Sequence, residues 1–444
     1  MADKRLLKQI ALEQWETQQK LDSGTPRQAL EVVASYLRMS HAIVISGMRR
    51  AGKSTLLAQI ARKHYEGKYY YFNFEDERLL DFKKEDFNHL FETLIELFGE
   101  KRVFFLDEIQ NVANWEVFVR RMMEQGYKFF ITGSNASLLS KELGTRLTGR
   151  SVVMELYPLS FREFLSFKKF DVTANSLSLT VQRAKIKRYF QEYAREGGIA
   201  EYHKFSDAVI IKGIYDDILY RDIVARHDIK DVKALRELSL YYLTNVGSLF
   251  SYNNLKKVLR LGSENTVKSY TDFLQDSYLM FAVPRFSYSL KQQFLAQKKI
   301  YCVDNGIIST VAFQFSKNRG KYLENLVFIE LKRRGGEIFY FHSKEGCEID
   351  FIIKKGIKRN SLIQVTESLT DPKVRRREVS ALTSAMKELR LKTGLILTED
   401  EHERLKVKEG IIDIKPVYEW LLEYPRHPGR SERKTSPTDA LKWF

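Results

Sequence analysis

The feature that most constrains the fold is an octapeptide that contains two glycines and lies between an apolar strand and a helix. Residues 42–46 (AIVIS) are largely apolar and β-branched, which is typical of a fully buried strand. Residues 47–54 (GMRRAGKS) follow the spacing G-x-x-x-x-G-K-[ST], and residues 55–65 continue as a helix. The glycines let successive N–H groups point at one spot, and the helix dipole favours an anion there. This context predicts a phosphate-binding P-loop.

Each residue type in this loop has an expected role. The Lys53 ammonium is expected to reach the β- and γ-phosphates of ATP. The Ser54 hydroxyl is expected to hold Mg²⁺, which prefers oxygen ligands. The residues expected to contact the nucleotide are Gly47, Arg49, Arg50, Ala51, Gly52, Lys53, Ser54 and Thr55.

A second apolar strand ends in two carboxylates. Residues 103–106 are apolar and precede Asp107 and Glu108, downstream of the P-loop and of a strand-like segment at residues 69–74. Asp107 is expected to hold Mg²⁺ through water, and Glu108 to polarise the attacking water. An isolated Asp-Glu after a strand could be a solvated turn, but its position behind a P-loop favours a catalytic pair. The adjacent pair resembles that of AAA+ ATPases, since many other P-loop folds have only the Asp.

The AAA+ resemblance implies a polar residue that orients the attacking water. Ser134 and Asn135 follow a predicted strand at residues 128–132, which is where AAA+ proteins keep this residue. Asn135 is expected to act in catalysis and Ser134 to contact the nucleotide.

The resemblance also implies an arginine finger, which enters a neighbouring subunit's site and stabilises charge on the γ-phosphate. Its place is between a helix at residues 136–146 and the last sheet strand at residues 151–156. Arg146 and Arg150 are both candidates, and Arg150 is the preferred one. Alternatively, either arginine pairs with a carboxylate of its own chain.

Four segments, in this order and spacing, resemble those of prokaryotic AAA+-type ATPases near the STAND and archaeal ATPases, which carry a C-terminal domain of unknown function. The segments are GMRRAGKSTLL, FFLDEIQNV, ITGSNASLLS and LTGRSVVMELYPLSFREFL. The resemblance implies an α/β fold in which a parallel αβα P-loop core with a helical lid is followed by a winged helix and a restriction-nuclease-like α/β domain. The expected boundaries are 1–156 for the core, 157–230 for the lid, 231–310 for the winged-helix-like domain, 311–423 for the nuclease-like domain and 424–444 for a flexible tail.

Two features of the predicted lid have competing interpretations. Gly197-Gly198 interrupts a helix and is by default a plain C-cap, although the family's turn at this place could shape the lid near the nucleotide. Arg221 is a candidate lid contact, and the alternative is a surface ion pair.

Residues 232–286 are predicted to form a winged helix-turn-helix. The polar face of its third helix fits a recognition helix that contacts DNA. Winged helices also serve as protein scaffolds, so both interpretations stay open. The residues of the polar face are Asn265, Thr266, Lys268 and Ser269.

The last domain departs from the nuclease pattern. Restriction-type nucleases place Glu on a helix, Asp on the second strand and Glu-x-Lys on the third, where carboxylates hold Mg²⁺ and the lysine activates water. Glu324 and Asp350 match the first two positions, but the third is Gln364-Val365-Thr366. The sequence therefore predicts a nuclease-like fold without nuclease activity.

The chain carries 73 Lys and Arg against 57 Asp and Glu, a net charge of +16. This balance suits an acidic partner such as nucleic acid, nucleotide or a membrane surface, or simply a basic soluble surface. Cys302 and Cys347 lie in no CxxC or Cys/His cluster, so neither a zinc site nor a disulfide framework is expected. The absence of a signal-like or membrane-spanning apolar run predicts a cytoplasmic protein that does not enter a membrane.

These features together predict an ATPase that binds ATP and Mg²⁺, assembles into a homo-oligomer and acts as a switch or motor on nucleic acid. The alternative is a regulatory or signalling scaffold that uses ATP to recruit a protein partner with little turnover. An ATP-driven nuclease is disfavoured by Thr366.

Overall fold

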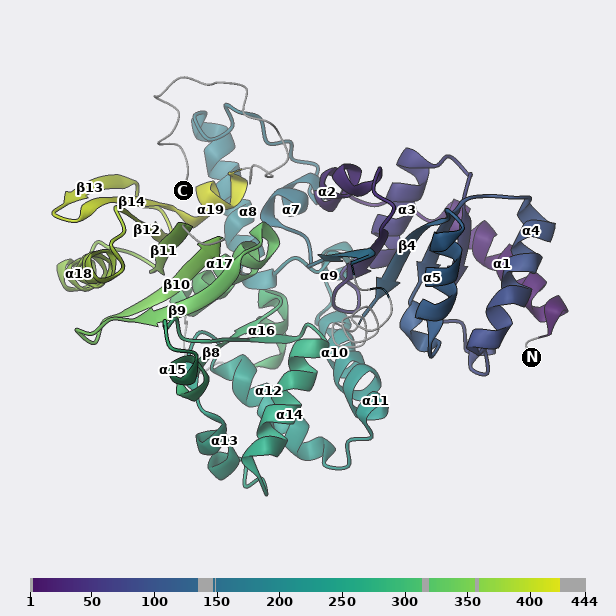
Figure 1. Ribbon diagram of the computed structural model, residues 1–444. Helices are drawn as coiled ribbons and strands as arrows, with labels where there is room; N and C mark the ends of the chain where they lie inside the picture. Colours follow the sequence, from purple (N-terminus) through teal and green to yellow (C-terminus); the bar gives the residue numbers. More distant parts are fainter. Residues whose placement is uncertain (1–2, 135–146, 148, 314–318, 356–358, 424–444) are drawn as a thin grey trace. The chain divides into compact units, whose positions relative to one another are not determined.

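The structure is a computed structural model that describes residues 3–134, 147, 149–313, 319–355 and 359–423 (Figure 1). The predicted flexible tail, residues 424–444, lies outside the described residues. The chain divides into two compact units. The first comprises Met1–Pro158, Asp216–His227 and Gln275–Leu279, and the second comprises Leu159–Tyr215, Asp228–Leu274 and Met280–Phe444.

The first unit is built on a five-stranded sheet in the order β2-β3-β4-β1-β5, in which every pair is parallel. The expected parallel core is therefore present. Because the strands run the same way, the carboxyl ends of β1, β3 and β4 meet at one edge, where ligands bind in open parallel sheets. The strands are β1 (Ala42–Ser46), β2 (Tyr70–Asn73), β3 (Val103–Asp107), β4 (Lys128–Gly133) and β5 (Ser151–Glu155).

Helices cover both faces of this sheet (Figure 1). Successive strand residues alternate between two apolar clusters: Val44 packs with α1, α4 and α5, whereas Ile43 and Ile45 pack with α2 and α3. The longer helices are α1 (Lys4–Lys20), α2 (Ala29–Tyr36), α3 (Lys53–His64), α4 (Phe87–Phe98) and α5 (Trp115–Glu124). The short elements are η1 (Glu77–Leu79), η2 (Lys84–Asp86), η3 (Ile109–Asn111), η4 (Ile218–Val224, a π-helix) and α11 (Ala225–His227).

The second unit contains two sheets. A three-stranded antiparallel sheet has the order β6-β8-β7, and a six-stranded mixed sheet has the order β13-β14-β12-β11-β10-β9. Its strands are β6 (Leu249–Phe250), β7 (Met280–Val283), β8 (Lys298–Cys302), β9 (Glu337–His342), β10 (Glu348–Lys355), β11 (Arg359–Val365), β12 (Thr393–Thr398), β13 (Glu403–Val407) and β14 (Gly410–Pro416).

Helices make up most of the rest of the second unit. They are α7 (Phe161–Phe167), α8 (Thr180–Glu196), α9 (Ala200–Phe205), α10 (Ala208–Asp217, whose last two residues belong to the first unit), α12 (Val232–Thr244), α13 (Tyr252–Val258), α14 (Glu264–Asp276), α15 (Leu290–Leu295), α16 (Asn305–Val311), α17 (Arg319–Arg334), α18 (Pro372–Leu389) and α19 (Val417–Leu422).

Helices α12, α13 and α14 and the sheet β6-β8-β7 occupy the segment predicted as a winged helix. Helix α13 begins only at Tyr252, because Leu249 and Phe250 pair with β8. The Ser251 side chain then caps α13 by accepting a hydrogen bond from the Asn254 N–H. The winged-helix interpretation itself stays a prediction.

The C-terminal part places a helix, a hairpin and further strands where the sequence predicts them. Helix α17 carries Glu324, and β10 carries Asp350 and pairs antiparallel with β11. The mixed sheet packs against α18 through an apolar cluster that includes Ile352, Leu382 and Ile396. Among the described residues, no helix has the length and apolar character needed to cross a membrane.

The Gly197-Gly198 pair ends α8, in agreement with the C-cap interpretation. Gly197 has φ +72°, and a Cβ there would lie 1.9 Å from the Asp304 carboxylate. A Cβ on Gly198 would lie 2.2 Å from the Leu159 carbonyl oxygen. The N–H groups of Gly198 and Gly306 both donate to the Asp304 carboxylate, at 2.6 and 2.8 Å. Close approach to the Asp304 carboxylate therefore explains Gly197, and close approach to the Leu159 carbonyl explains Gly198.

Candidate functional site: a P-loop at the carboxyl edge of the parallel sheet

The P-loop leaves β1 and enters α3 through two glycines that the geometry requires. A Cβ on Gly47 would lie 2.1 Å from the Leu156 carbonyl oxygen, so no side chain fits there. Gly52 has φ +93°, a left-handed conformation that favours glycine, and it directly precedes the first residue of α3, Lys53. The N-terminus of α3 therefore begins inside the loop, as anion binding requires.

A buried arginine, which no sequence motif indicates, holds this loop through hydrogen bonds. Arg27 is 7% exposed and donates to the Ala51 carbonyl at 2.7 Å and to the Tyr157 carbonyl at 2.7 Å. Its backbone N–H donates to the Gln59 side chain at 3.2 Å. Arg27 thus ties the P-loop to the segment that follows β5.

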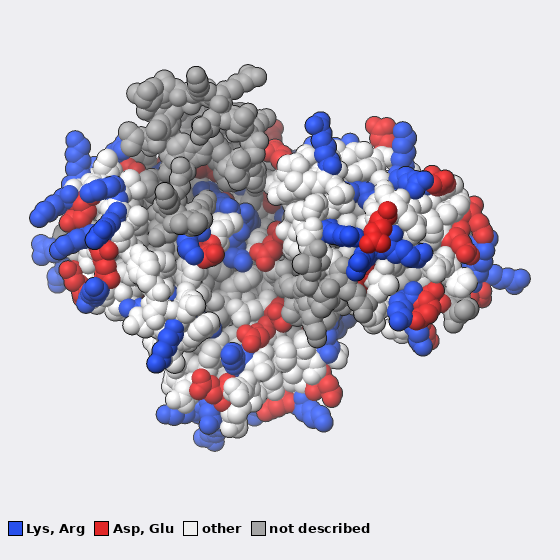
Figure 2. Space-filling view, in the orientation of Figure 1, with Lys and Arg blue, Asp and Glu red and all other residues white. Residues whose placement is uncertain are grey.

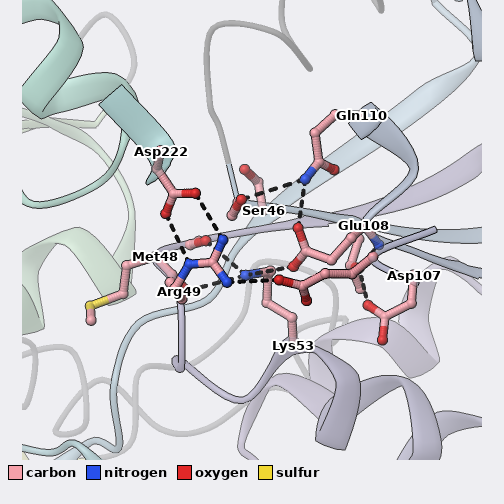
Figure 3. A network of polar contacts seen from close by, with 12 residues as sticks. Ser46, Met48, Arg49, Lys53, Asp107, Glu108, Gln110 and Asp222 are labelled. Carbon is pink, nitrogen blue, oxygen red and sulfur yellow. Dashed lines mark hydrogen bonds and ion pairs between the residues drawn. The ribbon is translucent and has the colours of Figure 1, made fainter. Parts of the chain in front are cut away.

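Lys53 is buried and points into the loop (Figure 3). Its ammonium donates to the carbonyls of Gly47 and Met48, each at 3.2 Å. It also lies 3.2 Å from a carboxylate oxygen of Glu108. The predicted phosphate-binding cation and the predicted water-polarising acid are therefore partners in this structure.

Asp107 ends β3 and is fully buried. Its carboxylate accepts hydrogen bonds from the Thr132 hydroxyl of β4 and from the Tyr71 hydroxyl of β2, the latter at 3.2 Å. Burial and the neighbouring Glu108 charge raise the pKa of Asp107, while hydrogen bonds from Thr132 and Ser54 act to lower it. A Ser54 hydroxyl beside a strand-end carboxylate fits the oxygen ligands that Mg²⁺ prefers.

Glu108 has φ +50°, so the chain turns in a left-handed conformation directly after β3. Its second carboxylate oxygen accepts a hydrogen bond from the Gln110 side-chain amide at 2.5 Å. That amide also lies 3.4 Å from the Ser134 hydroxyl at the end of β4. Burial acts to raise the pKa of Glu108, but the Lys53 charge and the Gln110 hydrogen bond outweigh it and lower the pKa. Both carboxylate oxygens of Glu108 are therefore engaged, one by Lys53 and one by Gln110.

Arg49 was predicted to contact nucleotide, and here it holds two carboxylates. It makes a two-pronged ion pair with Asp222 of η4, at 2.9 and 3.2 Å, and a further contact with Glu75 at 2.8 Å (Figure 3). Arg221, the candidate lid contact, lies 3.8 Å from the same Glu75, which agrees with the surface ion-pair interpretation. The P-loop is thereby connected to residues 216–227 of the same unit.

The end of β1 has a second distant partner in this unit. The Tyr278 hydroxyl donates to the Ser46 hydroxyl at 2.7 Å, and Tyr278 is 2% exposed. Both residues belong to the first unit, although they are 232 positions apart in the sequence.

The remaining predicted residues differ in how exposed they are. Ala51 is buried in the loop, Thr55 is partly buried on α3, and Ser54 and Arg50 are more exposed. Asn135 and Arg146 lie outside the described residues.

Arg150 is placed away from its own P-loop. Its backbone carbonyl accepts from the Ala42 N–H, at the amino-terminal edge of the sheet, and its guanidinium pairs with Glu124 at 2.8 Å. Both side chains of this pair are about half exposed. Arg150 therefore pairs with a carboxylate of its own chain, as the alternative interpretation expects, and its role as an arginine finger stays a prediction.

Sequence reasoning missed several groups that build the site, including Arg27, Tyr71, Thr132, Asp222 and Tyr278. Thr132 and Tyr71 carried a usable signal, because they lie on β4 and β2, the strands on either side of the one that bears Asp107. The others reach the site from segments whose proximity no local pattern reveals.

Known protein families match successive parts of the chain. An AAA domain matches residues 39–165, the domain of unknown function DUF8612 matches residues 188–318, and the domain of unknown function DUF4143 matches residues 319–420. The first match covers the five-stranded sheet, the P-loop and the Asp-Glu pair. Residues 39–165 therefore form an AAA-type P-loop fold, and this supports nucleotide binding.

Relatives of this chain extend the similarity over most of its length. An uncharacterized protein of Methanocaldococcus jannaschii, MJ1544, is 37% identical over 398 residues, covering 86% of this chain and 88% of MJ1544. The chain belongs to the MJ1544 family. An uncharacterized protein of Haemophilus influenzae is 34% identical over 330 residues, covering 70% of this chain and 79% of that protein. Within the MJ1544 family, similarity thus spans both units described above.

Solved structures give weaker likenesses than the MJ1544 family does. A RuvB variant of Thermotoga maritima aligns with a TM-score of 0.30 and 18% identity, covering 58% of this chain and 86% of that one. AMPPCP-bound DnaA from Aquifex aeolicus aligns with a TM-score of 0.24 and 16% identity, covering 56% and 87%. TM-scores this low support no conclusion about this chain.

Proposed function

We propose that the chain is a Mg²⁺-dependent ATPase that works as a nucleotide-driven switch or motor. The observation that carries this proposal is the convergence of Lys53, Asp107 and Glu108 at the carboxyl edge of a parallel sheet, beside an AAA-type P-loop. This combination supplies a phosphate-binding cation, a metal-binding carboxylate and a water-activating carboxylate within one buried site.

Nucleotide binding requires Lys53 to change partners. Its ammonium now rests on two loop carbonyls and on Glu108. The β- and γ-phosphates offer a stronger anionic partner, and backbone N–H groups at the start of α3 add to it. ATP therefore competes with Glu108 for Lys53, and binding releases the Glu108 carboxylate.

Ser54 and Asp107 would hold the metal ion, Ser54 directly and Asp107 through water. Mg²⁺ supplies neutralisation of the charge that develops on the phosphates. The hydrogen bonds from Tyr71 and Thr132 fix the orientation of the Asp107 carboxylate. They keep Asp107 in place whether or not nucleotide is bound.

Once released from Lys53, Glu108 can accept a proton from the attacking water, as a general base positioned by its turn. Gln110 and Ser134 line the same side of the site and can align that water. Asn135, the other predicted member of this group, remains a prediction.

The trans arginine is also part of the proposal. Arg150 is half exposed and lies at the sheet edge opposite its own P-loop. If it acts as the arginine finger, it must leave Glu124 and enter the site of a neighbouring chain, and the proposed active form is therefore a homo-oligomer.

The target of the switch is proposed to be nucleic acid, on the strength of the +16 charge. The face shown in Figure 2 intersperses basic with acidic side chains, so this face offers no single basic track. The alternative, an ATP-gated scaffold with little turnover that recruits a protein, is favoured by one observation: both oxygens of Glu108 are engaged at rest.

A phosphate-release assay tests the proposal. The wild type should release phosphate from ATP only with Mg²⁺, and Lys53→Ala should abolish this. Lys63→Ala, an exposed lysine on the same helix, is the matched control and should be unaffected. A wild-type rate no higher than that of Lys53→Ala would contradict the proposal.

A second arm of the assay separates the two target classes. Stimulation by double-stranded DNA that falls steeply with salt supports the nucleic-acid reading. Slow turnover that is indifferent to DNA supports the scaffold.

A further inference from the structure

A buried lysine lies at the centre of the carboxylate cluster in the C-terminal part of the chain. Lys299 of β8 is 2% exposed. Its ammonium lies 3.0 Å from Glu324, 2.8 Å from Asp350 and 2.7 Å from Glu348. The ammonium donates hydrogen bonds to Glu324 and Asp350, and Glu348 adds an ion-pair contact. All four residues belong to the second unit.

The carboxylates of the two predicted metal ligands have further partners. The Glu324 oxygen that faces Lys299 also accepts from the Tyr301 hydroxyl at 2.6 Å. The second oxygen of Asp350 accepts from the Val365 N–H at 2.9 Å. The other oxygen of Glu324 lies against Gly247, where an added Cβ would be 3.0 Å away.

Gln364, at the third position of the nuclease pattern, also has hydrogen-bond partners of its own. The Gln364 side-chain oxygen accepts from the Asp350 N–H at 3.2 Å, and its amide nitrogen donates to Glu378 at 2.8 Å. Gln364 therefore holds the two strands and α18 together and presents no free oxygen to the centre.

This arrangement does not fit the ion that the nuclease-like pattern implies. Mg²⁺ needs near-octahedral oxygen ligands at about 2.0–2.1 Å. Here the position between Glu324 and Asp350 is filled by a cation that donates hydrogen bonds to both. The same carboxylates line a cavity of about 370 Å³, so solvent reaches the centre and burial alone does not exclude a metal.

We propose that the Lys299 ammonium is the resident cation of this centre, taking the place that a divalent ion has in restriction-type nucleases. The lysine comes from β8, a strand of the other sheet, and ties the helix α17 and the strand β10 to it. The centre is a structural ion cluster, and the wild-type chain binds no divalent ion there.

The proposal makes the identity of residue 299 decisive for metal binding. Lys299→Met removes the ammonium at similar side-chain volume and takes away the cation that Glu324, Glu348 and Asp350 share. Glu324 and Asp350 are buried, so losing the cation between them is unfavourable, and a divalent cation can replace it. The variant should therefore acquire a metal site that the wild type lacks.

The test is a calorimetric titration of the full chain with Mn²⁺ in the absence of nucleotide. Far-UV circular dichroism verifies that each variant is folded. Lys299→Met should bind one additional Mn²⁺ per chain relative to the wild type, and Mn²⁺ should raise its Tm more than that of the wild type. The double variant Lys299→Met, Asp350→Asn is the matched control and should not gain this site.

A second comparison does not depend on the folding of Lys299→Met. The wild type and Asp350→Asn should bind the same number of Mn²⁺ ions. The proposal would be overturned if the wild type showed a Mn²⁺ site, or DNA cleavage, that Asp350→Asn abolishes. It would also be overturned by a folded Lys299→Met variant that gains no Mn²⁺ site.

Discussion

The ammonium of Lys53 lies 3.2 Å from the carboxylate of Glu108, and the two side chains are 4% and 13% exposed. The cation that should bind phosphate and the acid that should activate water thus neutralise each other before nucleotide arrives. The contact keeps two opposite charges paired inside a buried site. We expect ATP binding to break this ion pair.

Glu108→Gln should separate binding from chemistry. The amide cannot accept the proton of the attacking water, so we expect phosphate release to fall by about 100-fold or more. The substitution also removes the charge that competes for Lys53, so ATP affinity should be unchanged or higher. A phosphate-release assay measures the loss of turnover, and calorimetric titration measures the ATP affinity. Glu100→Gln, an exposed carboxylate on the same unit, is the control, and normal turnover in Glu108→Gln would contradict the assignment.

Asp222→Asn should loosen residues 216–227 from the P-loop. The change removes the charge that holds Arg49 in a two-pronged pair, and we expect a loss of about 1–3 kcal/mol in the free energy of unfolding. Urea denaturation measures the loss. Arg221→Gln alters only a 3.8 Å contact with Glu75 from a half-exposed side chain, and should stay within about 0.5 kcal/mol. Equal effects of the two variants would contradict a special role for Asp222.

Arg150→Ala should abolish turnover without weakening ATP binding, because the arginine is remote from its own P-loop. Mixed with Lys53→Ala, it should recover part of the activity, since mixed interfaces of one orientation pair the intact P-loop of one chain with the intact arginine of the other. Phosphate release from the mixture measures the recovery. Arg120→Ala, which removes another partner of Glu124, is the control. An inactive mixture of two folded variants would contradict the trans role.

Asp304 should make stability depend on pH. Burial raises its pKa from the ordinary 3.8 to about 6, although the Gly198 and Gly306 N–H groups act to lower it. The folded chain thus holds this proton more tightly than the unfolded chain. The resulting stability is present below about pH 4 and is lost as the pH rises through about 6. Between pH 5 and pH 7.5 the loss should be about 1–1.5 kcal/mol.

The comparison that isolates this group is Asp304→Asn. Urea denaturation at both pH values should show that the wild type loses this stability relative to the variant as pH rises. A difference between the two chains that does not change with pH would contradict the account.

The parts of this molecule that depend on a short contiguous sequence pattern can be predicted from the sequence. The residues 47–54 carry their own turn chemistry and are flanked by a strand and a helix, so one short stretch is enough. Asp107 and Glu108 end an apolar strand, which is again a local pattern. The order of elements around α12, α13 and α14 follows from helical periodicity in the same way.

Contacts between distant segments could not be predicted in this way. Tyr278 reaches Ser46 across 232 positions, and Asp222 reaches Arg49 across 173. The nuclease pattern predicts a lysine two positions after Gln364, where this chain has Thr366. A buried lysine from β8 contacts Asp350 instead, and it lies 51 positions before Asp350 in the sequence. Tertiary packing supplies these charges, so their partners emerge only from the fold.

The most direct test of the central claim is a calorimetric titration of the folded chain with Mg-ATP. The account predicts saturable binding at one site per chain, lost in Lys53→Ala and retained in Lys63→Ala. No saturable heat in the wild type, or equal affinity in the wild type and Lys53→Ala, would contradict the claim that residues 47–54 bind the triphosphate.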